Sequence, residues 1–483
     1  MNAEVGRVLI SKASDFELTA GEVGTCRKSA DVQSDSYLLG HPSYNAAMPY
    51  RETPMQSISQ TTWPALLFAA LIATSTAIAQ DNSPSIEQLL LEGRLADSEQ
   101  AAKQAIQADA DDQVARFGLG VTQFLQAIEG LAQDNFRYGL LTGRTGAIPM
   151  MRLSVPQNPD AEEISYQKAR AIVEAFIGRL KAARETLHAI KPNDELRLRI
   201  RIGAVRIDVN GDGKLEESET IWRISQLAGN ARQRRNVKQQ DDFPIAFDAG
   251  DVRWLEGYCH LLSAAGEAVL AYDWRDQFER TAHMFYPRVK SPYAFFADEA
   301  PASPMSFEPR SILDLIAWVH TFNYELVDAK RMQHALTHLE TVVKLSQESW
   351  ELIKAETDDD REWLPNPNQT STMGQLIITQ DVLTGWYEFL DEVDSILQGK
   401  TLVPFWRGVR INGPVRGVPL NDKIGINARK IFTNPTRFDL VLWMQGTGLH
   451  PYLEEGKIVD RTKWNKMMRS FRGSFFSYFF WIN

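Results

Sequence analysis

Apolar residues recur at three- and four-residue spacing over most of the chain beyond residue 80, as they do in amphipathic helices. The spacing predicts helices over about 89–106, 115–131, 161–190, 251–272, 274–284, 310–330, 332–355 and 372–397. Residues 134–160 and 230–250 are polar or rich in Gly and Pro, which predicts connecting loops. The pattern indicates a mostly α fold, built as a multi-helix array.

The segment from Gly399 onward has a different character, because Pro, Gly and Asn become frequent. Residues 438–444, FDLVLWM, predict a strand or a short buried segment. We therefore expect residues 399–483 to form an irregular, partly β C-terminal segment that is rich in aromatic residues.

Residues 208–219, DVNGDGKLEESE, interrupt the helical pattern with oxygen-bearing side chains at fixed spacing. The positions one, three, five, seven, nine and twelve of this segment are Asp208, Asn210, Asp212, Lys214, Glu216 and Glu219. With Gly213 at position six, the segment resembles the calcium-binding loop of the EF-hand family. The resemblance implies that these six residues bind one Ca²⁺, Lys214 through its carbonyl and Glu219 through both carboxylate oxygens.

A surface turn rich in Asp, Asn and Gly is the alternative interpretation of this segment. That interpretation accounts for its first six residues. It does not account for the apolar Leu215 at position eight or for Glu219 at position twelve. The complete spacing favours calcium as the cofactor, and we expect a single EF-hand helix-loop-helix over 196–228.

Residues 196–207, which precede the loop, fit two patterns. The letters LRLRIRI alternate apolar and basic residues, which indicates a strand. The same stretch places Leu196, Ile200, Ala204 and Ile207 on one helical face. Because an EF-hand needs an incoming helix, we predict a helix here.

Residues 89–120 hold small residues at positions where paired helices would touch, and they resemble a fragment of a tetratricopeptide repeat. The resemblance covers about one and a half repeat units, so it implies a helical hairpin over 80–140 rather than a solenoid. The helical domain that contains the loop is then expected over 160–398.

The first 79 residues have the features of a leader that ends in a signal peptide. Ala65–Ala73 form a short apolar core, and Ala77-Ile78-Ala79 supply a small-x-small cleavage pattern before Gln80. The apolar run is shorter than the roughly 20 residues that span a bilayer. We expect a secreted protein of the bacterial periplasm or exterior, without a transmembrane segment after cleavage. Either Met48 or Met55 is the true start, or the leader is unusually long.

Composition narrows the class of partner. A hydrophobic fraction of 44% with 10% aromatic residues is that of a globular protein rather than a disordered one. The formal net charge of −10 argues against a nucleic-acid partner, which calls for a basic face. Cys259 is the only cysteine beyond residue 79, so no disulfide can form within the exported part. We expect a calcium-binding protein with a structural or interaction role.

Two surfaces are candidates for a protein partner: a helical face, or the aromatic C-terminus. The aromatic residues of that terminus are Phe475, Phe476, Tyr478, Phe479, Phe480 and Trp481. Exposed apolar clusters mark interaction sites. Packing of the tail onto the core is the competing expectation.

The alternative function is that of an enzyme of the hydrolase type. Glu256 and His260, and again Glu279 and His283, are carboxylate–imidazole pairs four residues apart on expected helices. Two such pairs on neighbouring helices would form an acid–base or metal site. Ordinary pairing along a helix surface explains the same spacing, so the non-enzymatic interpretation is favoured.

Overall fold

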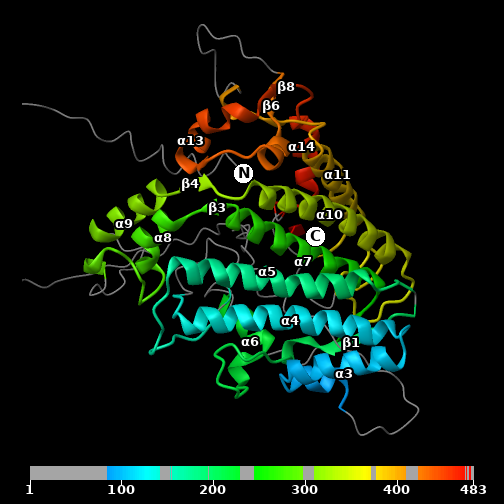
Figure 1. Ribbon diagram of the computed structural model, residues 1–483. Coiled ribbons are helices and arrows are strands. Elements are labelled where there is room, and N and C mark those ends of the chain that lie inside the picture. Colours follow the sequence, from blue (N-terminus) through cyan, green and yellow to red (C-terminus); the bar gives the residue numbers. More distant parts are fainter. Residues whose placement is uncertain are drawn as a thin grey trace, which may run out of the picture. The chain divides into compact units, whose positions relative to one another are not determined.

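The computed structural model of the protein describes residues 84–141, 153, 155–193, 195–228, 244–296, 309–370, 377–408, 423–473, 475, 478 and 479. The fold is mostly helical, with small antiparallel sheets toward its C-terminal half (Figure 1). The expected leader and signal peptide over 1–79 lie outside the described residues. Among the residues that are described, no helix is both long and apolar enough to cross a membrane.

The first helices are α2 (Ile86–Leu91), α3 (Leu95–Ala108), α4 (Gln113–Arg137) and α5 (Tyr166–His188). The middle of the chain forms α6 (Ile221–Ala228), α7 (Ala249–Leu270), α8 (Arg275–Thr281), α9 (Pro309–His320) and α10 (Ala329–Ala355). The last helices are α11 (Gln380–Leu397), α12 (Ala428–Thr433), α13 (Leu440–Gln445) and α14 (Arg461–Ser470). These bounds confirm most of the helices that the apolar spacing predicts.

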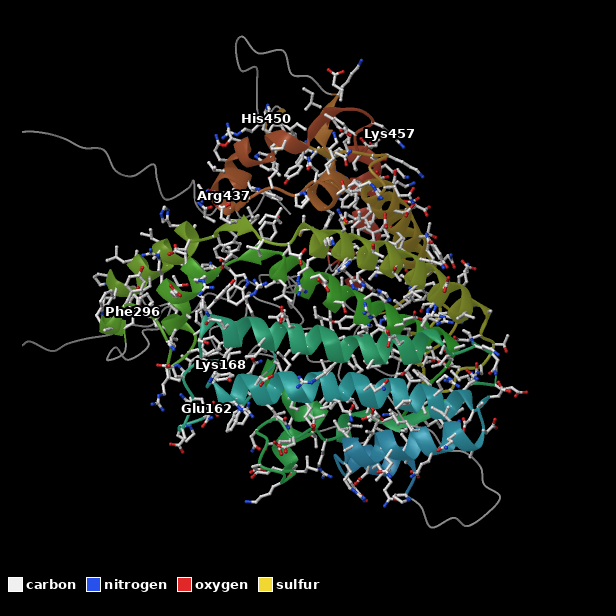
Figure 2. All side chains as sticks on the ribbon, viewed as in Figure 1. Glu162, Lys168, Phe296, Arg437, His450 and Lys457 are labelled. Carbon is white, nitrogen blue, oxygen red and sulfur yellow. The ribbon has the colours of Figure 1, made fainter. Side chains whose placement is uncertain are left out.

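The long helices form an array in which each packs against the next. The order of neighbours is α3, α4, α5, α7, α10, α11 and α14 (Figure 1). Side chains fill the space between them (Figure 2), and the largest fully buried ones include Trp254, Trp350, Trp363 and Trp386. This continuous apolar core is the main source of stability for helices of this kind, since propensity alone is weak.

Short polar side chains fix where the long helices begin. The side chain of Asp112 accepts the backbone N–H of Ala115 at the start of α4, and Ser165 caps α5 in the same way. Asp248, Asp328 and Thr379 cap α7, α10 and α11. Each cap satisfies an N–H group that has no partner within its helix.

Within the part of the chain that the structure describes, three small sheets join segments that are separated in sequence. The first pairs β1 (Leu198–Arg201) with β2 (Pro244–Phe247). The second has the order β3 (Tyr272–Asp273), β4 (Asn323–Leu326), β7 (Phe438–Asp439). The third has the order β5 (Val403–Pro404), β6 (Ile424–Ile426), β8 (Leu453–Glu455), and all the pairs are antiparallel.

The helix predicted over 196–207 is wrong. Residues 198–201 are strand β1, and a short 3₁₀ turn follows over Ile202–Ala204. Leu198 and Ile200 are buried while Arg199 and Arg201 are exposed, which is the two-residue period of the sequence itself. The loop at 208–219 is therefore entered from a strand and left through helix α6, so the expected helix-loop-helix is a strand-loop-helix.

Three other local predictions need correction. The helix expected over 310–330 ends at His320, and strand β4 follows it. The loop expected over 230–250 includes strand β2 and the start of α7, while residues 229–243 lie outside the described part. Residues 438–444 form only a two-residue strand before α13, and α13 is largely exposed rather than buried.

The described aromatic residues of the C-terminus pack on the core. Tyr478 is buried, and Phe475 and Phe479 contact Phe389 of α11 edge-on. Phe476, Phe480 and Trp481 lie outside the described residues.

Gly93 makes the turn between α2 and α3 that the apolar spacing does not predict. Its φ of +68° lies in the left-handed region, where L side chains are strained. A Cβ at this position would lie 2.5 Å from Cδ1 of Leu215, so the loop at 208–219 packs directly on this turn. Gly93 therefore serves both the chain reversal and the seat of Leu215.

Replacing Gly93 tests this double role. Gly93→Ala should lower the free energy of unfolding by about 1–2 kcal/mol for the left-handed conformation alone, with a further loss from displaced Leu215. Gly178→Ala is the matched control, because a Cβ there meets nothing within 4 Å on an exposed helix position. The control should gain roughly 0.5–1 kcal/mol. Urea unfolding of the three proteins measures both, and equal stabilities would contradict the assignment.

Candidate metal centre

The loop over residues 208–219 is folded around the side chain of Asp208. The backbone N–H of Gly211 donates to Oδ1 of Asp208 at 2.7 Å, and that of Gly213 donates to Oδ2 at 3.0 Å. Gly211 and Gly213 have φ of +73° and +72°, which glycine adopts without strain. The two glycines thus allow the backbone to wrap around the first carboxylate of the loop.

The next two side chains repeat a tighter version of this turn. Oδ1 of Asn210 accepts the N–H of Asp212 at 2.8 Å, and Oδ1 of Asp212 accepts the N–H of Lys214 at 2.8 Å. Such bonds from a side chain to the backbone two residues on are the reason that Asn and Asp favour turns. Lys214 and Glu216 are exposed at the loop surface.

Glu219 closes the loop from its far end. Its Oε1 accepts the N–H of Val209 at 3.1 Å, and its Oε2 accepts the N–H of Glu216 at 2.9 Å. The side chain is buried, and burial raises the pKa of its carboxyl from 4.5. Because Glu219 accepts the N–H of Val209, the residue after Asp208, the two ends of the loop lie close together, and the charge of Asp208 adds to the rise in the pKa of Glu219.

A short antiparallel bridge holds the two ends of the loop together. Arg206 pairs with Thr220 in this bridge. The N–H of Ile207 donates to the carbonyl of Glu219 at 3.2 Å. The N–H of Ile221 donates to the carbonyl of Val205 at 2.9 Å. The loop is thus closed by the backbone of its own flanks.

Helix α4 holds the start of the loop. Oε2 of Glu129 accepts the N–H of Asp208 at 2.9 Å, and Nε2 of Gln133 donates to the carbonyl of Asp208 at 2.9 Å. Leu215, at loop position eight, packs against Gly93 in the turn before α3. The α2–α4 region therefore contacts the loop where a second EF-hand loop would be expected.

Sequence reasoning missed Glu129, although it is the most perturbed acid near the loop. Burial, followed by the charges of Asp208 and Glu219, raises the pKa of Glu129 to about 7. Its distance of 79 residues from Asp208 leaves no local signal. Glu129 is the first acid within helix α4, and its place beside Ile128 was the available hint.

The residues of the expected acid–base site have separate partners. Glu256 is buried and accepts from Nδ1 of His188 at 2.8 Å and from Arg253 at 2.7 Å. Nδ1 of His260 lies 2.8 Å from Nδ1 of His338, on α10. His260 is therefore bonded to another helix rather than to Glu256.

The second pair is placed elsewhere. Nε2 of His283 lies 3.6 Å from the carboxylate of Asp314, and its ring stacks on Phe296. The carbonyl of Glu279 accepts the hydroxyl of Ser291. Neither Glu279 nor His283 lines the cavity of about 610 Å³ at Trp274 and Trp318 or the cavity of about 410 Å³ at Arg184 and His338.

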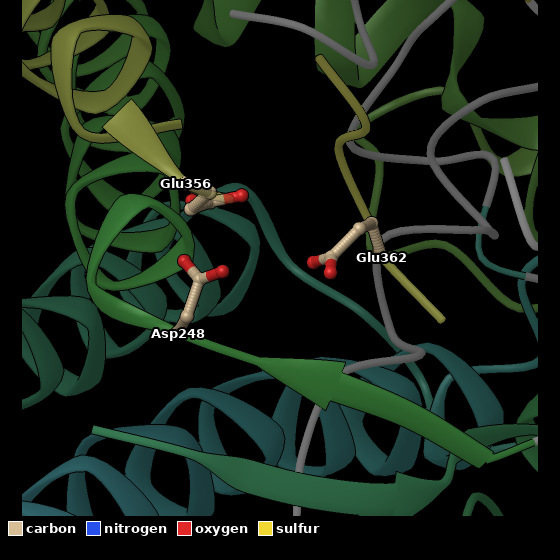
Figure 3. Close-up of side chains that lie close together, drawn as sticks. All are labelled: Asp248, Glu356 and Glu362. Atoms are coloured by element: carbon tan, nitrogen blue, oxygen red, sulfur yellow. The ribbon is translucent and has the colours of Figure 1, made fainter. Parts of the chain in front are cut away.

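A second acidic cluster lies at the start of α7. Figure 3 shows the carboxylates of Asp248, Glu356 and Glu362 directed toward one another, and one oxygen of each lies within 4.8 Å of the others. Asp248 caps α7 together with Asp251, and the N–H of Asp360 donates to Glu362. The spacing Asp248-x-x-Asp251 before a helix is a capping signature that sequence reasoning also missed.

Raised pKa values favour the protonated forms of these acids, which reduces the charge repulsion within the cluster. Burial first, and then the charges of neighbouring carboxylates, raises the pKa of Glu356 to about 9 and that of Glu362 to about 7. Burial also raises the pKa of Asp248 and, well above its ordinary value, that of Asp251. The cluster brings together three carboxyl groups, whereas the loop at 208–219 offers six residues at the EF-hand spacing, in line with the six to eight oxygens that Ca²⁺ takes. The loop at 208–219 is the better candidate for a metal centre.

Neither a protein-family model, nor a curated protein, nor a solved structure matches the chain.

The raised pKa of Glu129 predicts a pH dependence of the metal-free protein. The folded state holds a proton that the unfolded state releases above pH 4.5, so this contribution is present below pH 4.5 and is lost as pH rises through 7. Glu129→Gln keeps an oxygen for the N–H of Asp208 and removes the titration. Its stability relative to the parent should rise by about 3 kcal/mol between pH 4.5 and 8.

Urea unfolding in chelator at several pH values measures that difference. Glu162→Gln, an exposed acid that bridges Lys168 on the surface, is the control and should show no trend. A relative stability of Glu129→Gln that is flat across this pH range would contradict the prediction.

Proposed function

We propose that this chain is a calcium-binding protein that holds one Ca²⁺ in the loop over residues 208–219. The proposed ligands are the side chains of Asp208, Asn210, Asp212, Glu216 and Glu219, and the carbonyl of Lys214. The observation that carries the proposal is the folded loop itself. Its acids stand at the EF-hand spacing, and Asp208 and Glu219, from its two ends, interact through their charges.

A hard divalent cation would supply positive charge to a loop that is rich in carboxylates. Asp208, Asp212, Glu216 and Glu219 lie within twelve residues, and Glu129 adds a fifth carboxyl group beside Asp208. Like charges held close together repel, and burial of Glu219 and Glu129 increases that cost. Bound Ca²⁺ would offset the repulsion, with oxygen ligands at about 2.3–2.6 Å.

The proposed role of the ion is structural rather than regulatory. EF-hand sensors respond by changing the angle between two helices. This loop has a strand on one side, and the Arg206–Thr220 bridge and the Glu129–Asp208 bond already fix its ends. The predicted export to the periplasm or exterior agrees with this role, since calcium modules there have weak affinities of about 10⁻⁴–10⁻³ M. A hydrolase remains the second proposal from the sequence, and the separate partners of Glu256 and His260 lend it no support.

Calorimetric titration of the purified chain with Ca²⁺ tests the proposal. One site is expected, and Glu219→Gln should weaken it at least about 100-fold, more than is typical for residues that only support a ligand. Glu217→Gln is the matched control, because Glu217 is a neighbouring exposed acid at a position that does not ligate. Its affinity should stay within about fivefold of the parent. Equal heats for the two variants would remove the loop as the site.

Thermal unfolding gives a second measurement of the structural role. Calcium at 100 times its dissociation constant should stabilise the parent by about 2.7 kcal/mol. The Glu219→Gln variant should show no such gain. A parent melting temperature that does not respond to saturating calcium would contradict a structural ion.

A further inference from the structure

A cavity with a volume of about 610 Å³ lies among the described residues, away from the loop over 208–219. It is formed between α4, α5, the end of α7, α8, α9 and α13. This volume is within the roughly 300–1,000 Å³ range of small-molecule sites in proteins. Val269 lines the cavity and has an exposed side chain, so the cavity reaches the protein surface.

The lining of this cavity selects against charge. Half of its lining residues are aromatic, among them Trp274, Phe285, Trp318 and Trp443, and none of the described lining residues is acidic or basic. A charged group that entered would lose its hydration without gaining a partner. Hydrocarbon gains from burial against such walls.

Three buried hydrogen-bond donors of the lining residues have no partner. They are Nδ2 of Asn135 and the indole Nε1 atoms of Trp274 and Trp443. Because these atoms are buried, they offer no hydrogen bond at the cavity surface, and an occupant meets mainly apolar and aromatic side chains.

Helix α9 turns its apolar face outward. Ser311 is buried and Asp314 reaches inward to His283, whereas Leu313 and Ile316 are 64% and 58% exposed. Most surface helices have the opposite orientation. Helix α13, which packs against α9 (Figure 1), exposes Met444 at 65%.

These residues form one outer patch. Its members are Ile312, Leu313, Leu315, Ile316 and Val319 of α9, and Val441, Leu442 and Met444 of α13. The same two helices supply cavity walls, through Trp318 and Trp443. An alkyl chain would thus find apolar side chains on both faces of each helix, outside and in.

We propose that the cavity binds the hydrocarbon chain of an uncharged lipid, and that the outer patch rests on the bilayer from which that lipid is taken. Two observations on this chain support the proposal: the uncharged aromatic wall of the cavity, and the outward apolar face that adjoins it. Exposed apolar helix faces of this kind bind at the interface of lipid bilayers. The proposal does not depend on calcium binding.

The cavity is tested with matched ligands in solution. The neutral fluorophore N-phenyl-1-naphthylamine reports occupancy, and 1-dodecanol and dodecyltrimethylammonium compete for it with chains of equal length. The alcohol should displace the fluorophore at a concentration lower by at least about tenfold, because the charged head finds no partner. Equal displacement by both compounds would overturn the assignment of an uncharged ligand.

A pair of variants on α5 locates the fluorophore. Ala169 lines the cavity, whereas Ala175 is exposed on the same helix and does not. Ala169→Trp should reduce fluorophore binding at least fivefold (about the loss expected when part of a cavity is filled), and Ala175→Trp should leave it unchanged. Circular dichroism and melting temperature confirm folding of both. Undiminished binding in a folded Ala169→Trp protein would overturn the cavity as the site.

The outer patch is tested by flotation with phosphatidylcholine vesicles. The double variant Leu313→Ser, Ile316→Ser should lose co-flotation while it keeps fluorophore binding in solution. Ile377→Ser is the control, because Ile377 is 69% exposed but lies outside the patch. A parent protein that does not float, or a double variant that floats equally, would overturn the bilayer as the source.

Sedimentation velocity tests whether the outer patch binds a second copy of the chain instead of a bilayer. The parent and the double variant should both sediment as monomers. If the parent sediments as a dimer and the double variant as a monomer, the patch is an interface between two copies of the chain. That result would overturn the bilayer contact.

Discussion

The hydrogen bonds that α4 makes with Asp208 determine how the loop over 208–219 can behave. In a helix-loop-helix, two flanking helices position the ligands and can swing about the ion. Here the entering segment is a strand, and Glu129 and Gln133 hold the first residue of the loop from a helix that precedes it by some 79 positions. The loop belongs mechanically to the α2–α4 region, and Leu215 extends that attachment to the turn at Gly93. An ion in this loop would stabilise the docking of two parts of the chain.

Much of the fold could be predicted from the sequence because most of the helices are amphipathic. The apolar spacing and the capping residues determine where α4, α5, α7, α10 and α11 lie. The failures occur where two periods compete. Residues 196–207 satisfy both a helical and a strand pattern, and the outcome depended on Ile245 and Phe247 of β2, which lie more than forty residues away. Residues 321–327 include β4, which forms because it pairs with β3 on one side and β7 on the other. The local pattern does not include those two strands.

The candidate metal loop could be identified from spacing alone because all of its expected ligands fall within twelve residues. The structure adds what spacing cannot supply. Glu129 comes from a distant helix, and the cluster of Asp248, Glu356 and Glu362 joins three segments. The aromatic cavity is likewise assembled from helices across the chain, and α9 gave no sign in its periodicity of which face would point outward. Long-range assembly is the common reason that these features were missed.

Two opposite faces of helix α4 contact different parts of the protein within the same two turns. Glu129 and Gln133 bind the loop over 208–219, while Leu131 and Asn135, about half a turn away, line the aromatic cavity. A helix moves as a rigid rod over such a short span, so a displacement at one face is also felt at the other. Any linkage between occupants of the two places would be reciprocal: whatever free energy one contributes to the binding of the other is returned in equal measure. Residues 129–135 span about 9 Å of helix (six rises of about 1.5 Å each), so the linkage would act through fewer than two turns of α4.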